Sequence, residues 1–272
     1  MRRAGFSLVE LAVAGGLVAI VMLYVMQSFT SSQQTYTVVE QVSEVQQNLR
    51  IVADLVERDI RLAGYMVPKH AGVCAVDNVN APDMLFVSSA DAIRTVAALE
   101  AIGIDEVTKT FGAEATVGTG TAIGGAGTTT TLNLTNSWAD VSADGSDFTR
   151  GMGVIVVDAN DDSGVTTCGI VTDDPPTDPA VSPYPVEITF STDALPMTVV
   201  TSDIRVIPAH VYQIVDDANG IPQLLRDGVL IADEVEDLQL EFFFDADDDG
   251  LIDAGEYMGD LGQTVEIGRA HV

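Results

Sequence analysis

The sequence predicts an α+β fold: one long amino-terminal α-helix packed on a mostly antiparallel β-sheet domain. An apolar run opens the chain from Phe6 to Met26, and apolar residues continue at helical spacing as far as Ala63. No proline occurs before Pro68. Beyond that point, β-branched runs alternate with Gly, Pro, Asp and Asn, which is the pattern of short strands joined by turns.

The first apolar run has the length of a membrane span, since about 20 apolar residues cross a bilayer as a helix. It contains one acid, Glu10. A carboxylate in the hydrocarbon region costs a few kcal/mol, so we treat Glu10 as a functional residue. The alternatives are a secretory signal peptide, which would be shorter and end in small residues, and a plain anchor, which leaves Glu10 unexplained.

The junction Gly5-Phe6-Ser7-Leu8-Val9-Glu10-Leu11 resembles the processing and assembly motif of type IV pilins and of type II secretion pseudopilins. The resemblance implies that a prepilin peptidase cleaves after Gly5, removes residues 1–5 and methylates the new amino terminus at Phe6. It also implies that Glu10 pairs with the amino terminus of a neighbouring subunit, because two opposite charges buried together largely neutralise each other.

The helix is expected to run from about Phe6 to Ala63, a length of about 85 Å. Residues 6–27 would form its membrane or filament-core half, and residues 28–64 its amphipathic half. One apolar stripe follows the second half: Val38, Val42, Val45, Leu49, Val52, Val56, Ile60 and Ala63. Charged residues are expected away from that stripe: Glu40, Glu44, Arg50, Asp54, Glu57, Arg58, Asp59 and Arg61. The stripe should therefore face the globular domain, and Gly64 should end the helix.

The domain is expected to occupy residues 65–265. The candidate strands are Met84–Val87, Thr128–Leu134, Gly153–Val157, Gly169–Val171, Val186–Phe190, Ile204–Ile207, His210–Val215, Pro222–Arg226 and Val235–Phe244. Residues 90–102 could form a short helix. The tract 112–131, rich in Gly, Thr and Ala, indicates a surface loop, and 173–185, with five prolines, a connection.

Three further segments resemble the PilW-type minor pilins: Arg58-Asp59-Ile60-Arg61-Leu62-Ala63-Gly64-Tyr65, then Leu224-Leu225-Arg226-Asp227-Gly228, then the run 235–242. The resemblance implies a minor pilin that assembles or primes a type IV pilus, supporting twitching, adhesion or DNA uptake. Its partners would be other minor and major pilins. It would sit in the bacterial inner membrane before assembly, with a periplasmic domain. The alternatives are a minor pseudopilin of type II secretion and a membrane-anchored calcium-dependent adhesin.

Near the end, residues 245–256 fit the pattern of a calcium-binding loop. Oxygen donors fall at the ligand positions, Asp245, Asp247, Asp249, Leu251 (through its carbonyl), Asp253 and Glu256. Calcium takes six to eight oxygens and suits this set better than magnesium. The expected role is structural, and the alternative is a solvated acidic turn. In a similar stretch, 158–164, the glycine comes one position late, which favours a tight turn.

Composition excludes several classes of function. The formal net charge of −29 repels phosphate backbones, so we expect no general nucleic-acid binding. No nucleophile elbow, phosphate loop or dinucleotide fingerprint is present, and His70, His210 and His271 show no ligand spacing, so we expect no enzyme.

Two features of the chain keep alternatives open. Cys74 and Cys168 match no metal-ligand spacing. In the oxidising compartment that the leader implies, they could form one disulfide, or they could be two separate buried thiols. Residues 266–272 read like a translated sequencing adapter, and the alternative is a genuine final strand beginning at Thr264.

Overall fold

The structure is a computed structural model that describes residues 8–68, 70–78, 81–90, 107, 111–125, 127–135, 148–158, 166–173 and 184–240. The chain divides into two compact units, Met1–Ala53 and Asp54–Val272. The first unit contains most of the helix. The second contains the last turns of the helix and the β-rich domain.

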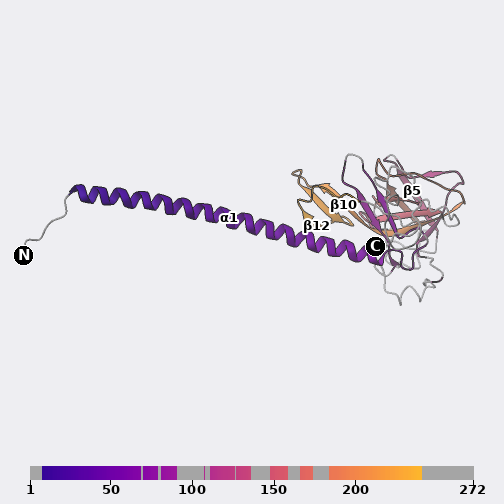
Figure 1. The fold of residues 1–272 in the computed structure, drawn as a ribbon. Coiled ribbons are helices and arrows are strands. Elements are labelled where there is room, and N and C mark those ends of the chain that lie inside the picture. Colours follow the sequence, from indigo (N-terminus) through magenta and orange to yellow (C-terminus); the bar gives the residue numbers. More distant parts are fainter. Residues whose placement is uncertain are drawn as a thin grey trace, which may run out of the picture. The chain divides into compact units, whose positions relative to one another are not determined.

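A single α-helix, α1 (Leu8–Leu62), accounts for 55 residues and is drawn as one unbroken coil in Figure 1. It confirms the predicted continuous helix. Gly64, with φ of 80°, lies just beyond its end in the left-handed conformation, which glycine adopts without a Cβ clash. The Gly64 amide donates to the carbonyl of Ser88 (2.9 Å), so the chain leaves the helix directly onto the domain.

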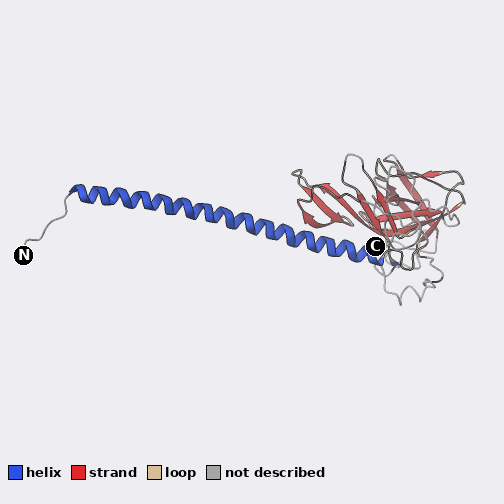
Figure 2. Cartoon of the chain, in the orientation of Figure 1, coloured by secondary structure: helices blue, strands red, loops and turns tan. Residues whose placement is uncertain are grey.

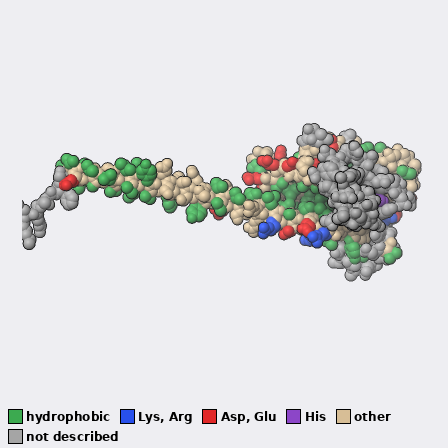
Figure 3. Space-filling view, viewed as in Figure 1, with side chains coloured by type: hydrophobic (Ala, Val, Ile, Leu, Met, Phe, Trp, Pro, Cys, Tyr) green, Lys and Arg blue, Asp and Glu red, His purple; other side chains and the backbone are tan. Residues whose placement is uncertain are grey.

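The first unit exposes its apolar side chains, which Figure 3 shows as hydrophobic atoms along the early part of α1. Within α1 there is a segment near the amino terminus long and apolar enough to span a membrane. The predicted stripe is also exposed over Val38, Val42, Val45 and Leu49. In the second unit, the last residues of the stripe, Val56, Ile60 and Ala63, pack on the β domain together with Leu55.

Twelve strands lie within the described part of the domain (Figure 2). They are β1 (Val73–Val76), β2 (Met84–Val87), β3 (Ala113–Thr116), β4 (Ala122–Ile123), β5 (Thr129–Thr135), β6 (Gly153–Asp158), β7 (Thr166–Val171), β8 (Tyr184–Thr189), β9 (Met197–Thr198), β10 (Asp203–Asp216), β11 (Pro222–Arg226) and β12 (Val229–Asp233). All pairings among them are antiparallel.

Strand β10 organises the domain because it belongs to two sheets. Its first half pairs with β3 and β6, and the ring β10-β3-β5-β8-β7-β6 closes back on β10 as a barrel. Its second half pairs with β2 and β11, giving a second sheet in the order β1-β2-β10-β11-β12. We call these the barrel and the outer sheet.

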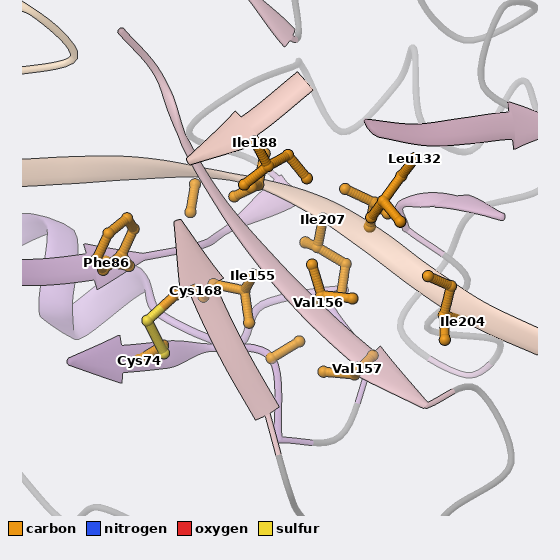
Figure 4. Close-up of a cluster of buried hydrophobic side chains, with 14 of the residues drawn as sticks. Cys74, Phe86, Leu132, Ile155, Val156, Val157, Cys168, Ile188, Ile204 and Ile207 are labelled. Carbon is orange, nitrogen blue, oxygen red and sulfur yellow. A yellow bond between two sulfur atoms is a disulfide. The ribbon is translucent and has the colours of Figure 1, made fainter. Parts of the chain in front are cut away.

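The two faces of the outer sheet belong to two different hydrophobic clusters. Phe86 and Val211 join the large core that fills the barrel, part of which Figure 4 shows. Their neighbours in the chain, Leu85 and Tyr212, point the other way into a smaller cluster with the end of α1. This separation follows from strand geometry, since successive side chains lie on opposite faces.

Most predicted strands are confirmed to within three residues at either end, but Pro208 does not divide β10 as expected. The sequence predicts two strands, 204–207 and 210–215, whereas one strand runs through both. The Pro208 carbonyl accepts a hydrogen bond from the Ser88 hydroxyl (2.7 Å) at the gap between the β3 and β2 pairings. Because N and O of one residue share an edge of a strand, the missing N–H falls in that gap.

The tract 112–131 is not the surface loop that its composition indicates. It contains β3, β4 and the start of β5, and Ala113 and Ala115 are buried in the barrel core. At Gly112 a Cβ would lie 2.7 Å from the Ile207 side chain. Close packing therefore requires a residue without a side chain at Gly112. In the sequence alone, the same small residues look like the absence of a core. The sequence analysis also missed β1, β9 and β12.

The predicted strand 235–244 is corrected over its described part. Residues 235–240 form no strand ladder. Instead, the Asp83 amide donates to the Leu238 carbonyl, and the Leu240 amide donates to the Asp83 carboxylate, each at 2.8 Å. The Asp83 carboxylate thus accepts a hydrogen bond that a backbone carbonyl would accept in a regular strand pairing. Of the predicted helix 90–102, residues 91–102 lie outside the described residues.

Candidate functional site

The strongest concentration of buried charge among the described residues lies at the end of α1. Asp59 is in the penultimate turn of the helix, and its side chain is only 2% exposed. The sequence predicts Asp59 among the charges that lie away from the apolar stripe, and this prediction is wrong. Asp59 follows Leu55 by four residues and Val56 by three, so helical geometry puts it on the buried face. That spacing was the available signal.

Three side chains donate hydrogen bonds to the Asp59 carboxylate. Tyr212 on β10 donates its hydroxyl to Oδ2 (2.7 Å), and Arg226 on β11 donates Nη2 to the same oxygen (2.6 Å). Arg58 reaches Oδ1 from Nη2 at 3.2 Å. The Arg226 guanidinium also lies over the Tyr212 ring, with Cζ 5.9 Å from the ring centroid. We call these four residues the Asp59 cluster.

The surroundings hold the Asp59 cluster in its charged form. Burial alone would raise the pKa of Asp59, but the hydrogen bond from Tyr212 and the charge of Arg226 outweigh it and hold that pKa below its ordinary value. Burial and the Asp59 carboxylate both raise the pKa of Tyr212, so the phenol keeps its proton. Burial alone would lower the pKa of Arg226, but Tyr212 and Asp59 beside it raise that pKa above its ordinary value. Tyr212 and Arg226 therefore act as donors, and Asp59 as an acceptor.

Apolar side chains surround the Asp59 cluster and complete what we call the joint. Leu85, Val87 and Tyr212 are its buried members, and partly buried residues pack against them. These are Leu55, Val56, Ile60, Ala63, Val73, Ile231, Leu238 and Leu240. All belong to the second unit of the chain. The joint thus combines the helix end, the outer sheet and the segment that follows β12.

The turn between β11 and β12 places Arg226 for this contact. Asp227 and Gly228 have φ of 54° and 75°, as a two-residue hairpin turn requires. Asp227 accepts a hydrogen bond from the Val211 amide (2.9 Å), and its Oδ2 lies 2.6 Å from His210 Nδ1. His210, which shows no ligand spacing in the sequence, thus has a structural contact with the hairpin turn.

Cys74 and Cys168 form a disulfide, which resolves the alternative that the sequence left open. The bond joins β1 of the outer sheet to β7 of the barrel, and Figure 4 shows it beside the barrel core. Both cysteines are buried. The outer sheet is therefore tied to the barrel covalently as well as through β10.

The other predicted site residues are placed only in part. Glu10 lies in the first turn of α1, while Gly5, Phe6 and the whole of 245–256 lie outside the described residues. In the stretch 158–164 only Asp158 is described. It ends β6 and accepts hydrogen bonds from the Val200 and Thr201 amides (2.8 Å each), which is a structural role. The described residues contain no group of three His, Cys, Asp or Glu placed to hold a metal.

No family model, curated protein or solved structure matches this chain. What its structure shows is a long apolar amino-terminal helix, docked by its last turns on a largely antiparallel β domain that carries a disulfide. The three segments singled out above meet at the joint. The segment 58–65 supplies Asp59, the segment 224–228 supplies Arg226, and the described part of 235–242 supplies Leu238 and Leu240.

Proposed function

We propose that this chain is a PilW-type minor pilin that takes part in assembling or priming a type IV pilus. The convergence of the three resembling segments on one buried joint supports the proposal. Residues 167 positions apart in sequence, Asp59 and Arg226, bond directly, so the segments form one structural device. This mutual contact supports the proposal, because three unrelated chance resemblances would have no reason to meet at one place.

In this proposal the two ends of α1 do different work. The exposed apolar residues from Leu8 to Met26 reside in the inner membrane and later pack among the helices of neighbouring subunits. Glu10 sits in the first turn and docks on the amino terminus of the neighbouring subunit. The joint at the other end carries the β domain. The chain's work is then assembly, and no reaction is assigned to it.

Replacing Glu10 with valine tests the proposal in the cell that makes the protein. We expect Glu10→Val to remain in the membrane fraction but to disappear from sheared surface filaments, because the docking charge is lost. Glu40→Val, which removes a second acid of α1, is the matched control and should leave filament entry unchanged. Equal filament entry of Glu10→Val and the unaltered chain would rule out the pilin function and leave a monomeric anchored adhesin.

A minor pilin and a type II secretion pseudopilin predict different phenotypes when the chain is deleted. Deleting the chain should reduce surface pili and leave secreted enzymes at normal levels. Loss of secretion with normal pili would assign the chain to the secretion apparatus instead. Both outcomes would keep the role of Glu10, since the leader resemblance covers both families.

We also propose that residues 245–256 bind calcium and stabilise the carboxy-terminal region. The donor set fits a hard cation because acidic and carbonyl oxygens occupy every ligand position. The chain enters this stretch from Leu240, which Asp83 holds against β2. Calcium at 100 times its Kd should add about 2.7 kcal/mol of stability. Calorimetry should show a higher Tm with calcium than with chelator, and no difference in Glu256→Gln. Identical melting of the unaltered chain in both conditions would end this proposal.

A further inference from the structure

The joint and the barrel are built as two separate packing units. Six strands form the complete ring of the barrel, and the large core that fills it also takes in one face of the outer sheet through Phe86 and Val211. The joint lies on the opposite face of the outer sheet and shares no side chain with that core. Within the described part of the chain, its buried members are Leu85, Val87 and Tyr212. Small clusters of this kind open at lower free energy than a main core.

The Asp59 cluster supplies the polar contacts that hold the joint together. One carboxylate of α1 binds donors from two strands, Tyr212 of β10 and Arg226 of β11. The Arg226 Nε is itself buried and has no hydrogen-bond partner among the described residues, so that side chain depends on its contact with Asp59. Removing one partner of a buried charge pair leaves an uncompensated charge, which strongly favours opening.

Neither the barrel nor the outer sheet depends on the Asp59 cluster for its strand pairing. β11 remains paired with β10 along five residue pairs, and the Val211 amide holds the turn through Asp227. The Cys74–Cys168 disulfide keeps β1 on the barrel. When the helix end leaves, the outer sheet therefore stays attached to the barrel on both sides of β10.

We propose that the last turns of α1, residues 54–62, form a dock that opens and closes on the outer sheet while both sheets stay folded. Asp59 is the residue that holds it closed. The dock is a conformational device: it lets the β domain change its inclination to the helix without unfolding. This inference does not rest on the proposed function, because the opening belongs to the isolated chain.

Spin-label distances in the full chain, held in detergent micelles, test the dock. Asp54 and Thr131 are exposed, so Asp54→Cys with Thr131→Cys places one label on the helix end and one on β5. A second pair, Thr131→Cys with Thr198→Cys, reports on the barrel alone. Cys74 and Cys168 are joined in their disulfide, so the introduced cysteines carry the free thiols that react with the spin labels.

We expect Asp59→Asn to replace the single narrow distance of the helix–barrel pair with a broad distribution, and to leave the barrel pair unchanged. Glu57→Gln removes the same charge from an exposed position two residues earlier, about half a helical turn away, and should leave both pairs unchanged. If Asp59→Asn does not fold, Tyr212→Phe removes a single donor and should broaden the same pair to a smaller degree. Broadening of both pairs together, or of neither, would overturn the dock.

Discussion

At the scale of the residue, Asp59 is a charged side chain that the fold can bury because donors from three positions meet it. Arg58, Tyr212 and Arg226 each hydrogen-bond to its carboxylate. The position also follows from the helix, since Asp59 shares a face with Leu55 and Val56. The same side chain on the opposite face would be an ordinary solvated charge worth little stability.

The pH dependence of stability should reveal this burial. The pKa of Asp59 is lower in the folded chain than in the unfolded one. Its stabilising contribution is therefore complete above the ordinary aspartate pKa of about 3.9 and is lost as pH falls through the lowered value. Denaturation of the full chain in micelles should show Asp59→Asn less stable by about 3–5 kcal/mol at neutral pH. The difference should narrow below about pH 4.

Glu57→Gln is the control for net charge, because Glu57 is exposed and forms an exposed ion pair with Arg61 on the next turn of the helix. It should change stability by less than about 1 kcal/mol. A stability difference between Asp59→Asn and the unaltered chain that stays constant from pH 7 to pH 3 would show that the Asp59 carboxylate does not stabilise the fold by its charge.

At the scale of the element, the chain leaves α1 at a place where the backbones of Gly64 and Gly72 lie in close contact. Gly64 ends the helix, and Gly72 precedes β1. Ser88 joins them, since it accepts from the Gly64 amide and donates its own amide to the Gly72 carbonyl (2.9 and 2.8 Å). The absence of side chains at both positions lets the helix end lie directly on the start of the outer sheet.

A methyl group at Gly72 should separate these backbones. A Cβ there would lie 2.9 Å from both Cα and N of Gly64, and backbone atoms cannot rotate away as a side chain can. We expect Gly72→Ala to destabilise the domain by about 1–3 kcal/mol, the usual cost of overpacking. The matched control is Gly118→Ala, whose Cβ would meet only the Thr121 hydroxyl, at 3.3 Å. Equal melting temperatures for the two variants would contradict this close contact.

At the scale of the whole molecule, the outer sheet is joined to the barrel by a shared core, a shared strand and a covalent bond. β10 contributes its first half to the barrel and its second half to the outer sheet. The disulfide crosses between the same two sheets at β1 and β7, linking residues 94 positions apart. A cross-link over so long a loop restricts the unfolded chain strongly.

Removing both cysteines should therefore cost stability without changing the fold. We expect Cys74→Ala with Cys168→Ala to lose about 2–4 kcal/mol of unfolding free energy in denaturant. Treating the unaltered chain with a reductant strong enough to open the disulfide should give a loss of similar size. If the double variant unfolds at the same denaturant concentration as the oxidised chain, the disulfide does not stabilise the domain.

The fold class and much of the secondary structure follow from the sequence alone. A 55-residue helix needs only helical apolar spacing and no proline, both of which are local properties. The predicted strand Met84–Val87 has its observed bounds, because an apolar run between turn residues is a local signal as well. The predicted bounds of Pro222–Arg226 also match the observed strand. The two cysteines allowed a disulfide or two separate thiols, and only the structure decides for the Cys74–Cys168 bond.

The tertiary structure alone decided where local signals conflict with packing. The tract 112–131 resembles a loop in composition, yet Ala113 and Ala115 are buried in the barrel core. Pro208 resembles a strand break, yet it falls where β10 changes partners. Asp59 resembles a surface charge, and its partner Arg226 lies 167 residues away. Each outcome depends on side chains that only folding brings together, and no window of sequence contains both members of such a contact.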